Sequence, residues 1–329
     1  MISRRDFLSC ATVAGVGAMT GVLPAFAQAY PSRPITLVVP FAAGGPTDTL
    51  ARIVAERMRA SLGQPIIVEN TTGAGGTIAV GRVVRATPDG YTVGIGVWNT
   101  HVLNGAIYSL PYDMIAELEP IVLLANNSSL IVSRKSIPAN DLKELIAWIK
   151  ENGDKVSVGT AGAGASTHVA GVLFQNLTGT HFQFVPYRGA APAVQDLVSG
   201  QIDLMFDQVS SALQHVRSGG TKAFAVTAGK RLPNAPDIPT AEEAGLPGFN
   251  ISVWHGLWAP KGTPKDAIGR LNAAAVEALD DPAVRKRLAD LGQEIYPRDR
   301  QTPEALGVFH KAEVEKWWPI VKAANIRVE

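Results

Sequence analysis

The chain has 329 residues, of which 46% are hydrophobic and 18% charged, an ordinary globular composition that is long enough for two domains. Thirty basic residues are balanced by 29 acidic ones, so the sequence carries no electrostatic footprint for nucleic acid or for an anionic membrane surface. The composition therefore indicates a small-molecule partner.

The first 27 residues have the features of an export signal. A basic start is followed by a weakly apolar stretch rich in Ala and Gly, and then by the cleavage pattern Ala25-Phe26-Ala27. The segment from Ser3 to Leu8 resembles a twin-arginine signal, and the alternative is a general secretory signal with a chance Arg pair. The apolar stretch is too short to favour a transmembrane anchor. We therefore expect residues 1–27 to be removed and the mature protein to be periplasmic.

Cleavage at this point removes Cys10, the only cysteine, and leaves the mature chain formally neutral. Cys10 precedes most of the apolar stretch, which argues against a lipoprotein acceptor site. Without thiols the mature chain can form neither disulfides nor cysteine-metal sites. The six histidines lie far apart, with none of the spacings typical of metal ligands. We expect no metal and no cofactor.

Apolar runs alternate with helical patterns along the mature chain, which predicts parallel β-α units and an α/β fold. The first series is predicted to contain strand 35–41, helix 47–62 ended by Gly63, strand 65–70, a helix that ends at Arg85, and strand 91–97. A long apolar stretch, 118–133, is interrupted by the polar residues 126–129. We expect this stretch to cross between two lobes.

A second β-α series is predicted between residues 142 and 228. Its helices are expected at 142–150, 167–177, 192–198 and 212–217, and its strands at 155–160, 182–187, 201–207 and 222–228. A second crossing is expected at 249–260, and the remainder is expected to be helical, with Pro264, Pro282 and Pro303 in first turns. The predicted division is a discontinuous first lobe, 28–126 with 253–329, and a second lobe, 127–252.

Glycine-rich loops follow three of the predicted strands, at 44–45, 73–76 and 162–164. Glycine allows the backbone to approach a ligand closely, and N–H groups at a helix N-terminus attract anions. Loops after neighbouring parallel strands meet at one crevice. None of these loops has the spacing of a nucleotide-binding fingerprint. The pattern predicts a site for a small anion. The alternative is tight turns in which Asp48, Ser166 and Thr167 only cap helices.

Further candidate side chains lie near strand ends. Arg188 could clamp a carboxylate or be solvated, and Asp207 could accept a hydrogen bond from a ligand hydroxyl or ammonium or only begin the next helix. Four residues could contact the far end of a ligand or belong to the core: Trp98, Asn99, Tyr187 and Trp254. No nucleophile-elbow or zinc-hydrolase motif occurs, so we expect no enzyme.

Six motifs, taken in order, resemble one family, the Bug-type or tripartite tricarboxylate transporter extracytoplasmic solute receptors. They are "PFAAGGPTD", "GAGGTIAVG" with "TPDGYTV", "GTAGAGASTHVAG", "VPYRGAAPAVQDLVSGQIDLMFD", "RLPNAPDIPTAEEAGLPGF" and "VWHGLWAPKGTP". They span nearly the whole mature chain. The resemblance implies a two-lobe, type II (Venus flytrap) binding protein with two hinge crossings. It also implies an organic carboxylate in the cleft and, as partner, a membrane permease with one large and one small subunit.

The resemblance also assigns ligand-binding positions. The matching residues are Phe41, Ala43, Gly44 and Gly45 in the first loop, Ala74, Gly75 and Gly76 in the second, Ser166, Thr167 and His168 in the second lobe, and Asp207. The chain departs from the family pattern at Thr71-Thr72, where Arg-Pro is usual, and at Val172, where Glu is common. We expect a monomeric binding protein, with two alternatives: a partner that presents a ligand to a membrane sensor, or an exported hydrolase.

Overall fold

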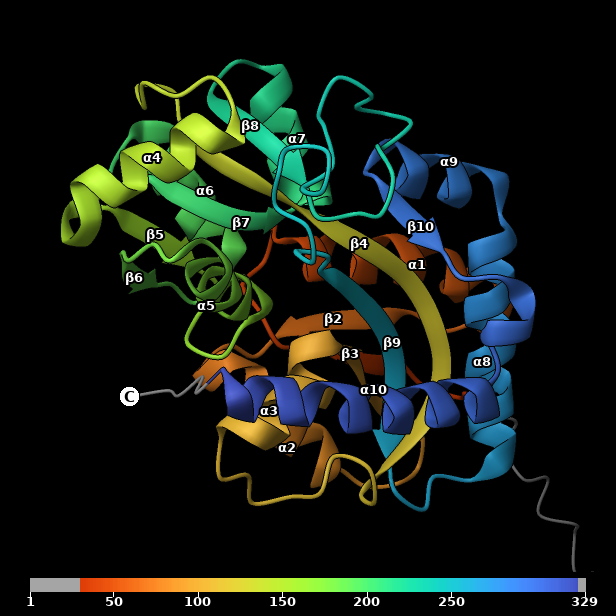
Figure 1. Cartoon of the computed structure of the whole chain (residues 1–329). Helices are drawn as coiled ribbons and strands as arrows, with labels where there is room; N and C mark the ends of the chain where they lie inside the picture. Colours follow the sequence, from red (N-terminus) through yellow and green to blue (C-terminus); the bar gives the residue numbers. More distant parts are fainter. Residues whose placement is uncertain (1–29, 325–329) are drawn as a thin grey trace, which may run out of the picture.

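The computed structural model describes residues 30–324 (Figure 1), so the predicted export signal lies outside the described residues. Up to the end of the first crossing, the elements are β1 (Ile35–Val39), α1 (Pro46–Leu62), β2 (Ile66–Asn70), η1 (Ala74–Gly76), α2 (Thr77–Val84), β3 (Thr92–Val97), η2 (Asn99–Leu103), α3 (Asn104–Ile107) and β4 (Leu118–Arg134).

The second β-α series contains α4 (Leu142–Asn152), η3 (Gly153–Lys155), β5 (Ser157–Thr160), α5 (Ser166–Thr178), β6 (Gln183–Pro186), α6 (Ala190–Ser199), β7 (Leu204–Gln208), α7 (Val209–Arg217) and β8 (Thr221–Val226). The chain ends with β9 (Ser252–Pro260), α8 (Lys265–Asp280), α9 (Pro282–Asp290), β10 (Gln293–Ile295), η4 (Arg298–Arg300) and α10 (Pro303–Ala323). Among these described helices, none is both long and apolar enough to cross a bilayer.

The strands form one continuous sheet with the order β2-β1-β3-β9-β4-β7-β5-β6, and β8 and β10 also pair with β4. The first-lobe strands β1, β2 and β3 run parallel, as do β5, β6 and β7 in the second lobe. Strand β9 is antiparallel to both β3 and β4. This topology confirms the α/β class and the two β-α series expected from the sequence.

Strand β4 belongs to both lobes. It pairs with β9 from Leu118 to Ser128, and with β7 and β8 from Ser129 onward. Three irregularities in its pairing, near Ile121, Leu124 and Ile131, let the strand bend as it passes from one lobe to the other. The polar residues 126–129 therefore lie inside a continuous strand, at the point where its partners change.

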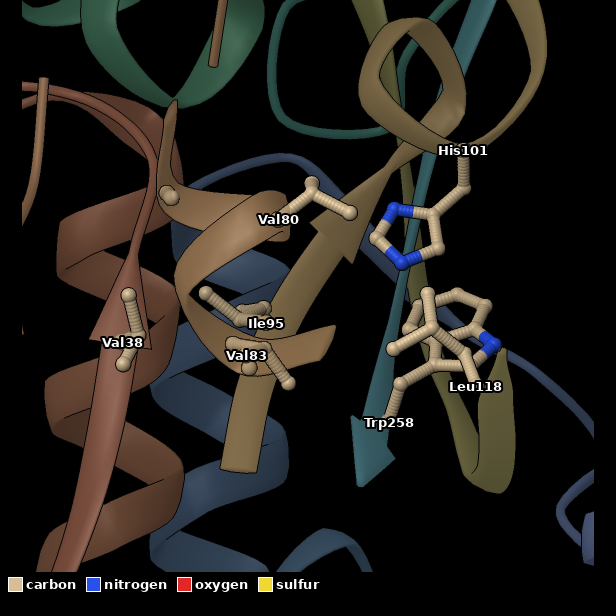
Figure 2. A pocket seen from close by; sticks show the side chains of 9 residues that line it. Val38, Val80, Val83, Ile95, His101, Leu118 and Trp258 are labelled. Carbon is tan, nitrogen blue, oxygen red and sulfur yellow. The ribbon is translucent and has the colours of Figure 1, made fainter. Parts of the chain in front are cut away.

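Helices cover both faces of each half of the sheet (Figure 1). In the first lobe, α1, α8 and α9 bury one face and α2, α3 and α10 the other. In the second lobe, α4 and α5 cover one face and α6 and α7 the other. The C-terminal helices α8, α9 and α10 thus pack on the same part of the sheet as α1, α2 and α3. Figure 2 shows a small cavity in this lobe, between α2 and β3, where His101 lies against Trp258. Its volume of about 10 Å³ leaves room for at most one water molecule.

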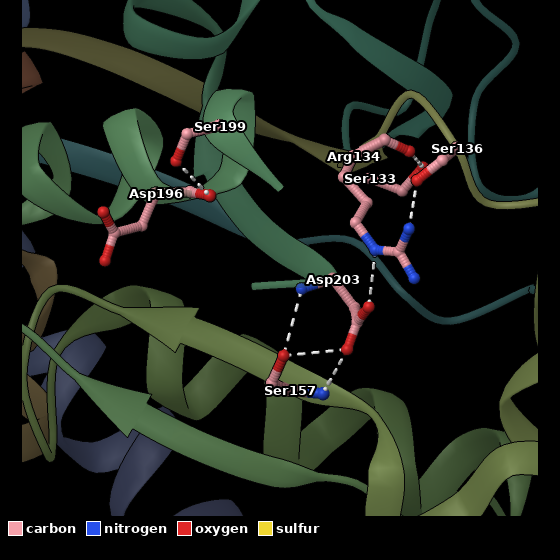
Figure 3. A network of polar contacts seen from close by, with 7 residues as sticks. All are labelled: Ser133, Arg134, Ser136, Ser157, Asp196, Ser199 and Asp203. Atoms are coloured by element: carbon pink, nitrogen blue, oxygen red, sulfur yellow. Dashed lines mark hydrogen bonds and ion pairs between the residues drawn. The ribbon is translucent and has the colours of Figure 1, made fainter. Parts of the chain in front are cut away.

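A partly buried polar network fixes the second-lobe sheet at the end away from the glycine loops (Figure 3). Arg134 Nε donates to Asp203 Oδ1 (2.7 Å), and Asp203 Oδ2 accepts from the Ser157 N–H and hydroxyl, both at 2.8 Å. Burial opposes ionisation of Asp203, but these donors outweigh it and lower its pKa. The network joins the end of β4, the start of β5 and the residue before β7, so the strands that carry the loops are held in register.

The predicted strands and helices of both series are present, with ends within a few residues of those expected. Gly63 ends α1, as predicted, and it does so in a left-handed conformation (φ +68°). The expectation of only helices after the second crossing is wrong at β10, a three-residue strand that pairs with β4. Residues 99–107, for which no element is predicted, form the π-helical turn η2 and the short helix α3.

Candidate functional site

A cavity of about 370 Å³ lies between the two lobes, at the carboxyl ends of β1, β2, β5 and β6. Loops from both lobes line it, and its walls are mostly backbone and small side chains. The lining residues are Phe41, Gly73, Ala74, Gly75, Gly76, Tyr108, Ala161, Gly162, Ala163, Pro186, Tyr187 and Arg188. Of the predicted site residues, Phe41, Ala74, Gly75, Gly76 and Tyr187 therefore line one cavity.

The loop after β2 has an unusual backbone. Four successive residues, from Gly73 to Gly76, all have positive φ, including Ala74 at +45°. The carbonyl oxygen of Gly75 accepts hydrogen bonds from the side-chain amides of Asn99 and Asn104, both at 3.0 Å. Because both amides are fully buried, they hold this strained loop in one orientation. Asn99 thus lies behind the cavity wall and positions the loop rather than lining the cavity.

The loop after β1 differs from the expectation in its hydrogen bonds. The Gly44 N–H donates to Asp48 Oδ2 (2.9 Å), so this donor already has a partner within the protein. Gly44 needs a left-handed φ of +81°, whereas Gly45, the N-cap residue of α1, has φ −78°, which any residue can adopt. A Cβ at Gly45 would lie 3.4 Å from the Ala42 carbonyl, so a steric need for glycine there is not supported. Ala43 lies in the same loop but does not line the cavity.

In the second lobe, two side chains brace the loop after β5. Thr167 Oγ1 accepts from the Ala161 N–H (2.8 Å), and His168 Nδ1 accepts from the Gly164 N–H (3.1 Å). Helix α5 begins at Ser166 and has Ala165 as its N-cap, with no side-chain capping bond. The alternative of simple helix capping by Ser166 or Thr167 is therefore wrong. These buried side chains lie directly behind the loop that lines the cavity.

Asp207 is fully buried near the end of β7, and it does not line the cavity. Neither carboxylate oxygen has a hydrogen bond of ordinary geometry among the described residues, although the Ser211 hydroxyl and the Gln208 N–H lie near. Burial raises the pKa of Asp207 to about 6, and those two neighbours oppose the rise. A buried carboxylate without partners is costly, so its retention marks a candidate functional group.

The aromatic candidates divide between the cavity and the core. Tyr187 lines the cavity while its hydroxyl donates to Asp196 Oδ2 (2.6 Å), within the second lobe. Trp98 and Trp254 are buried in the core of the first lobe, where Trp254 Nε1 donates to Glu313. Arg188 is exposed at the cavity rim, and no acidic group in the described part of the chain pairs with its guanidinium. Arg188 therefore provides a positive charge at the cavity.

The two lobes contact each other across this cavity through hydrogen bonds to backbone carbonyls. The Ala42 N–H donates to the Arg188 carbonyl oxygen (3.2 Å), and the Tyr108 hydroxyl donates to the Ala163 carbonyl oxygen (2.7 Å). Sequence reasoning missed Asn104 and Tyr108, which lie one helical turn apart after η2. The only signal for them was a polar residue and an aromatic residue four positions apart, in a segment without glycine-loop features.

The fold matches that of known binding proteins. A protein from Agrobacterium vitis, encoded in the TAR-I ttuE-ttuC' intergenic region, is 40% identical over 92% of this chain and 89% of its own length. The periplasmic binding protein BugD has a structure 42% identical to this chain, with a TM-score of 0.88 over 91% of this chain and all of BugD. MatC from Rhodopseudomonas palustris, solved with bound malate, is 41% identical, with a TM-score of 0.86 over 89% of this chain and all of MatC.

These neighbours confirm a two-lobe periplasmic binding-protein fold and the resemblance found in the motifs. The family model described as the tripartite tricarboxylate transporter family receptor matches residues 50–326, which is most of the chain. By the match of both sequence and structure, the chain belongs to the tripartite tricarboxylate transporter receptor family.

Proposed function

We propose that this protein is a periplasmic solute receptor that captures a small organic carboxylate between its lobes and delivers it to a tripartite membrane permease. The observation that carries the proposal is the 370 Å³ cavity, walled by strained backbone loops from both lobes. Its volume suits a ligand of a few carbon atoms. Membership of the receptor family and the malate bound to the related MatC support the same ligand class.

The ligand would be held mainly by backbone groups, with side chains in supporting roles. Arg188 supplies the charge at the rim that a carboxylate requires. Asn99, Thr167 and His168 fix the loops. Asp207 does not line the cavity in this structure, and we propose that it becomes accessible on ligand binding and accepts from a hydroxyl or ammonium next to the carboxylate. A receptor built in this way favours a hydroxy- or amino-substituted dicarboxylate over an unsubstituted one. We propose the remaining predicted residues, Ala43, Gly44, Gly45 and Ser166, as neighbours of the bound ligand.

Binding would close the two lobes over the ligand. A ligand that touches both lobes favours the closed arrangement by its higher affinity for it. We propose that the polar part of β4, Asn126 to Ser129, and the entry to β9, Asn250 to Val253, absorb the rotation. The lobe boundaries at 126/127 and 252/253 are part of this proposal, as is the monomeric state.

The test is a thermal-shift screen of the mature chain, beginning at Gln28, followed by calorimetry. The panel contains L-malate, succinate, adipate, citrate, L-aspartate and acetate. We expect a stabilising shift from at least one dicarboxylate, preserved after treatment with a chelator. No shift from any carboxylate in the panel would overturn the proposed ligand class. Delivery is tested separately: deletion of the permease genes should abolish uptake of the same carboxylate, and N-terminal sequencing of periplasmic protein should find Gln28 or a near neighbour.

A further inference from the structure

Tyr108 belongs to the first lobe but makes its polar contact with the second. It follows α3 directly, and its hydroxyl donates to the carbonyl oxygen of Ala163 at 2.7 Å. Its ring lies against Gly164, where an added Cβ would stand only 2.8 Å from the ring. Gly164 therefore leaves the space into which the tyrosine fits, so the contact combines a hydrogen bond with close packing.

On its own side, Tyr108 is fixed to the first lobe. Its backbone N–H donates to the Asn104 carbonyl (2.8 Å), and the Asn104 side chain donates to the Gly75 carbonyl (3.0 Å). Asn104 is fully buried, and it follows the π-helical turn η2, a local geometry common at functional sites. The tyrosine therefore moves with the first-lobe cavity loop.

On the other side, Ala163 is fixed to the second lobe. The residues around it are held by two hydrogen bonds. The Ala161 N–H donates to Thr167 Oγ1, and the Gly164 N–H donates to His168 Nδ1. The Ala165 N–H also closes the turn by donating to the Gly162 carbonyl (3.0 Å). Tyr108 is anchored to the first lobe and Ala163 to the second. The hydrogen bond between them therefore forms only when the lobes are as close as they are in this structure.

We propose that Tyr108 is a closure latch, a positioning residue that binds the second lobe rather than the solute and slows solute release. This inference rests on the proposed solute-binding function. The latch adds a contact to the closed arrangement that the open one lacks, so it shifts the equilibrium between them. One hydrogen bond of this kind changes an equilibrium by about three- to tenfold. The effect falls on dissociation, because the bond forms after the solute has entered.

The test compares the variant Tyr108→Phe with the wild type, and Tyr112→Phe is the matched control. Tyr112 also donates its hydroxyl to a backbone carbonyl, that of Thr77 at 3.3 Å, but within the first lobe. Each variant is prepared as the mature chain, which lacks native cysteine, with spin labels on Ile78→Cys in α2 and Leu177→Cys in α5. Both labelled positions are about half exposed, and they lie on different lobes. Interlobe distances are measured with and without L-malate, or with whichever panel carboxylate gives the largest thermal shift.

We expect Tyr108→Phe to populate longer interlobe distances than the wild type and to release the solute about three to ten times faster. Tyr112→Phe should match the wild type in both measurements. A wild-type distance distribution for Tyr108→Phe at saturating carboxylate would overturn the latch. Weaker binding with an unchanged closed fraction would also overturn it, because Tyr108 would then contact the solute itself. A wild type that neither closes nor shows a thermal shift would contradict the proposed function, and the latch with it.

Discussion

The carboxylate of Asp48 and the backbone N–H of Gly44 lie 2.9 Å apart across the start of α1. The same carboxylate accepts from Arg52 Nε and Asn70 Nδ2, both at 2.9 Å, and it is almost fully buried. Burial opposes ionisation of Asp48, but these donors outweigh it and lower its pKa. Asp48 thus connects the loop after β1, helix α1 and the end of β2. Its position in the sequence predicts only a helix cap.

Removing this carboxylate should destabilise the fold. We expect Asp48→Ala to lower the free energy of unfolding by ~1–3 kcal/mol, because it leaves the Gly44 N–H and the Asn70 amide without their buried acceptor. Asp266→Ala is the control, since Asp266 also lies in the first turn of a helix but is exposed. It should change stability by no more than about 0.5 kcal/mol. Urea unfolding measures both, and equal losses would show that only the helix dipole matters.

A second prediction concerns the backbone wall of the cavity. Gly75 has φ +58°, and a Cβ there would lie 2.6 Å from the Ala163 carbonyl on the opposite lobe. We expect Gly75→Ala to weaken carboxylate binding by at least tenfold, about 1.4 kcal/mol, because the lobes can no longer approach. Gly269→Ala in α8, where a Cβ would meet nothing within 4 Å, should bind normally. Calorimetry checks the pair, and normal affinity in Gly75→Ala would refute the role of this loop.

A third prediction concerns Asp207. Asp207→Asn should weaken binding of L-malate, because the substitution removes the charged acceptor, while the unliganded protein at pH 7.5 should be as stable as the wild type or more so. The second effect follows because the folded pKa of Asp207 is about 6. At pH 7.5 the carboxylate is therefore ionised while fully buried, which costs stability. Calorimetry and urea unfolding report the two effects. A large loss of stability with unchanged affinity would make Asp207 a structural residue.

A fourth prediction concerns stability in acid. Burial lowers the pKa of His255 to about 4, well below its value of about 6.5 in an unfolded chain. The folded protein therefore keeps this ring neutral while the unfolded chain takes up a proton, so stability is present above about pH 6.5 and is lost as the pH falls toward 4. The slope approaches about 1.4 kcal/mol per pH unit for one such group.

The measurement compares wild type and His255→Gln by urea unfolding between pH 7.5 and 4.5. Other buried groups titrate in this range: burial lowers the pKa of His310 to about 4 and raises that of Asp207 to about 6, with opposite effects on the slope. Because both are present in the two proteins, the difference in slope isolates His255. Parallel curves would contradict the prediction.

The sequence predicted the parts of this molecule that depend on periodic patterns. Alternating apolar strands and helices gave the two β-α series, and glycines at strand ends located the cavity loops. It could not show that Gly44 rather than Gly45 requires a left-handed backbone, because φ depends on how the loop is closed by Asp48. Tyr108 was missed for a similar reason. Its partner is a backbone carbonyl 55 residues away, and every residue has a carbonyl, so no residue type in the sequence indicates this contact.

The first lobe is completed by the last part of the chain to be synthesised. Helix α1 packs against α8, and Arg57 pairs with Glu277 and Asp281, which follow it by more than 200 residues. The second lobe, by contrast, is built from one continuous stretch, although its pairing also includes contacts such as that between the Ser129 N–H and the Thr227 hydroxyl, 98 residues apart. Because distant contacts form slowly, the apolar face of α1 stays uncovered until α8 arrives. The core of the first lobe is therefore complete only when both ends of the chain have come together, and apolar surface that waits for a distant partner favours aggregation.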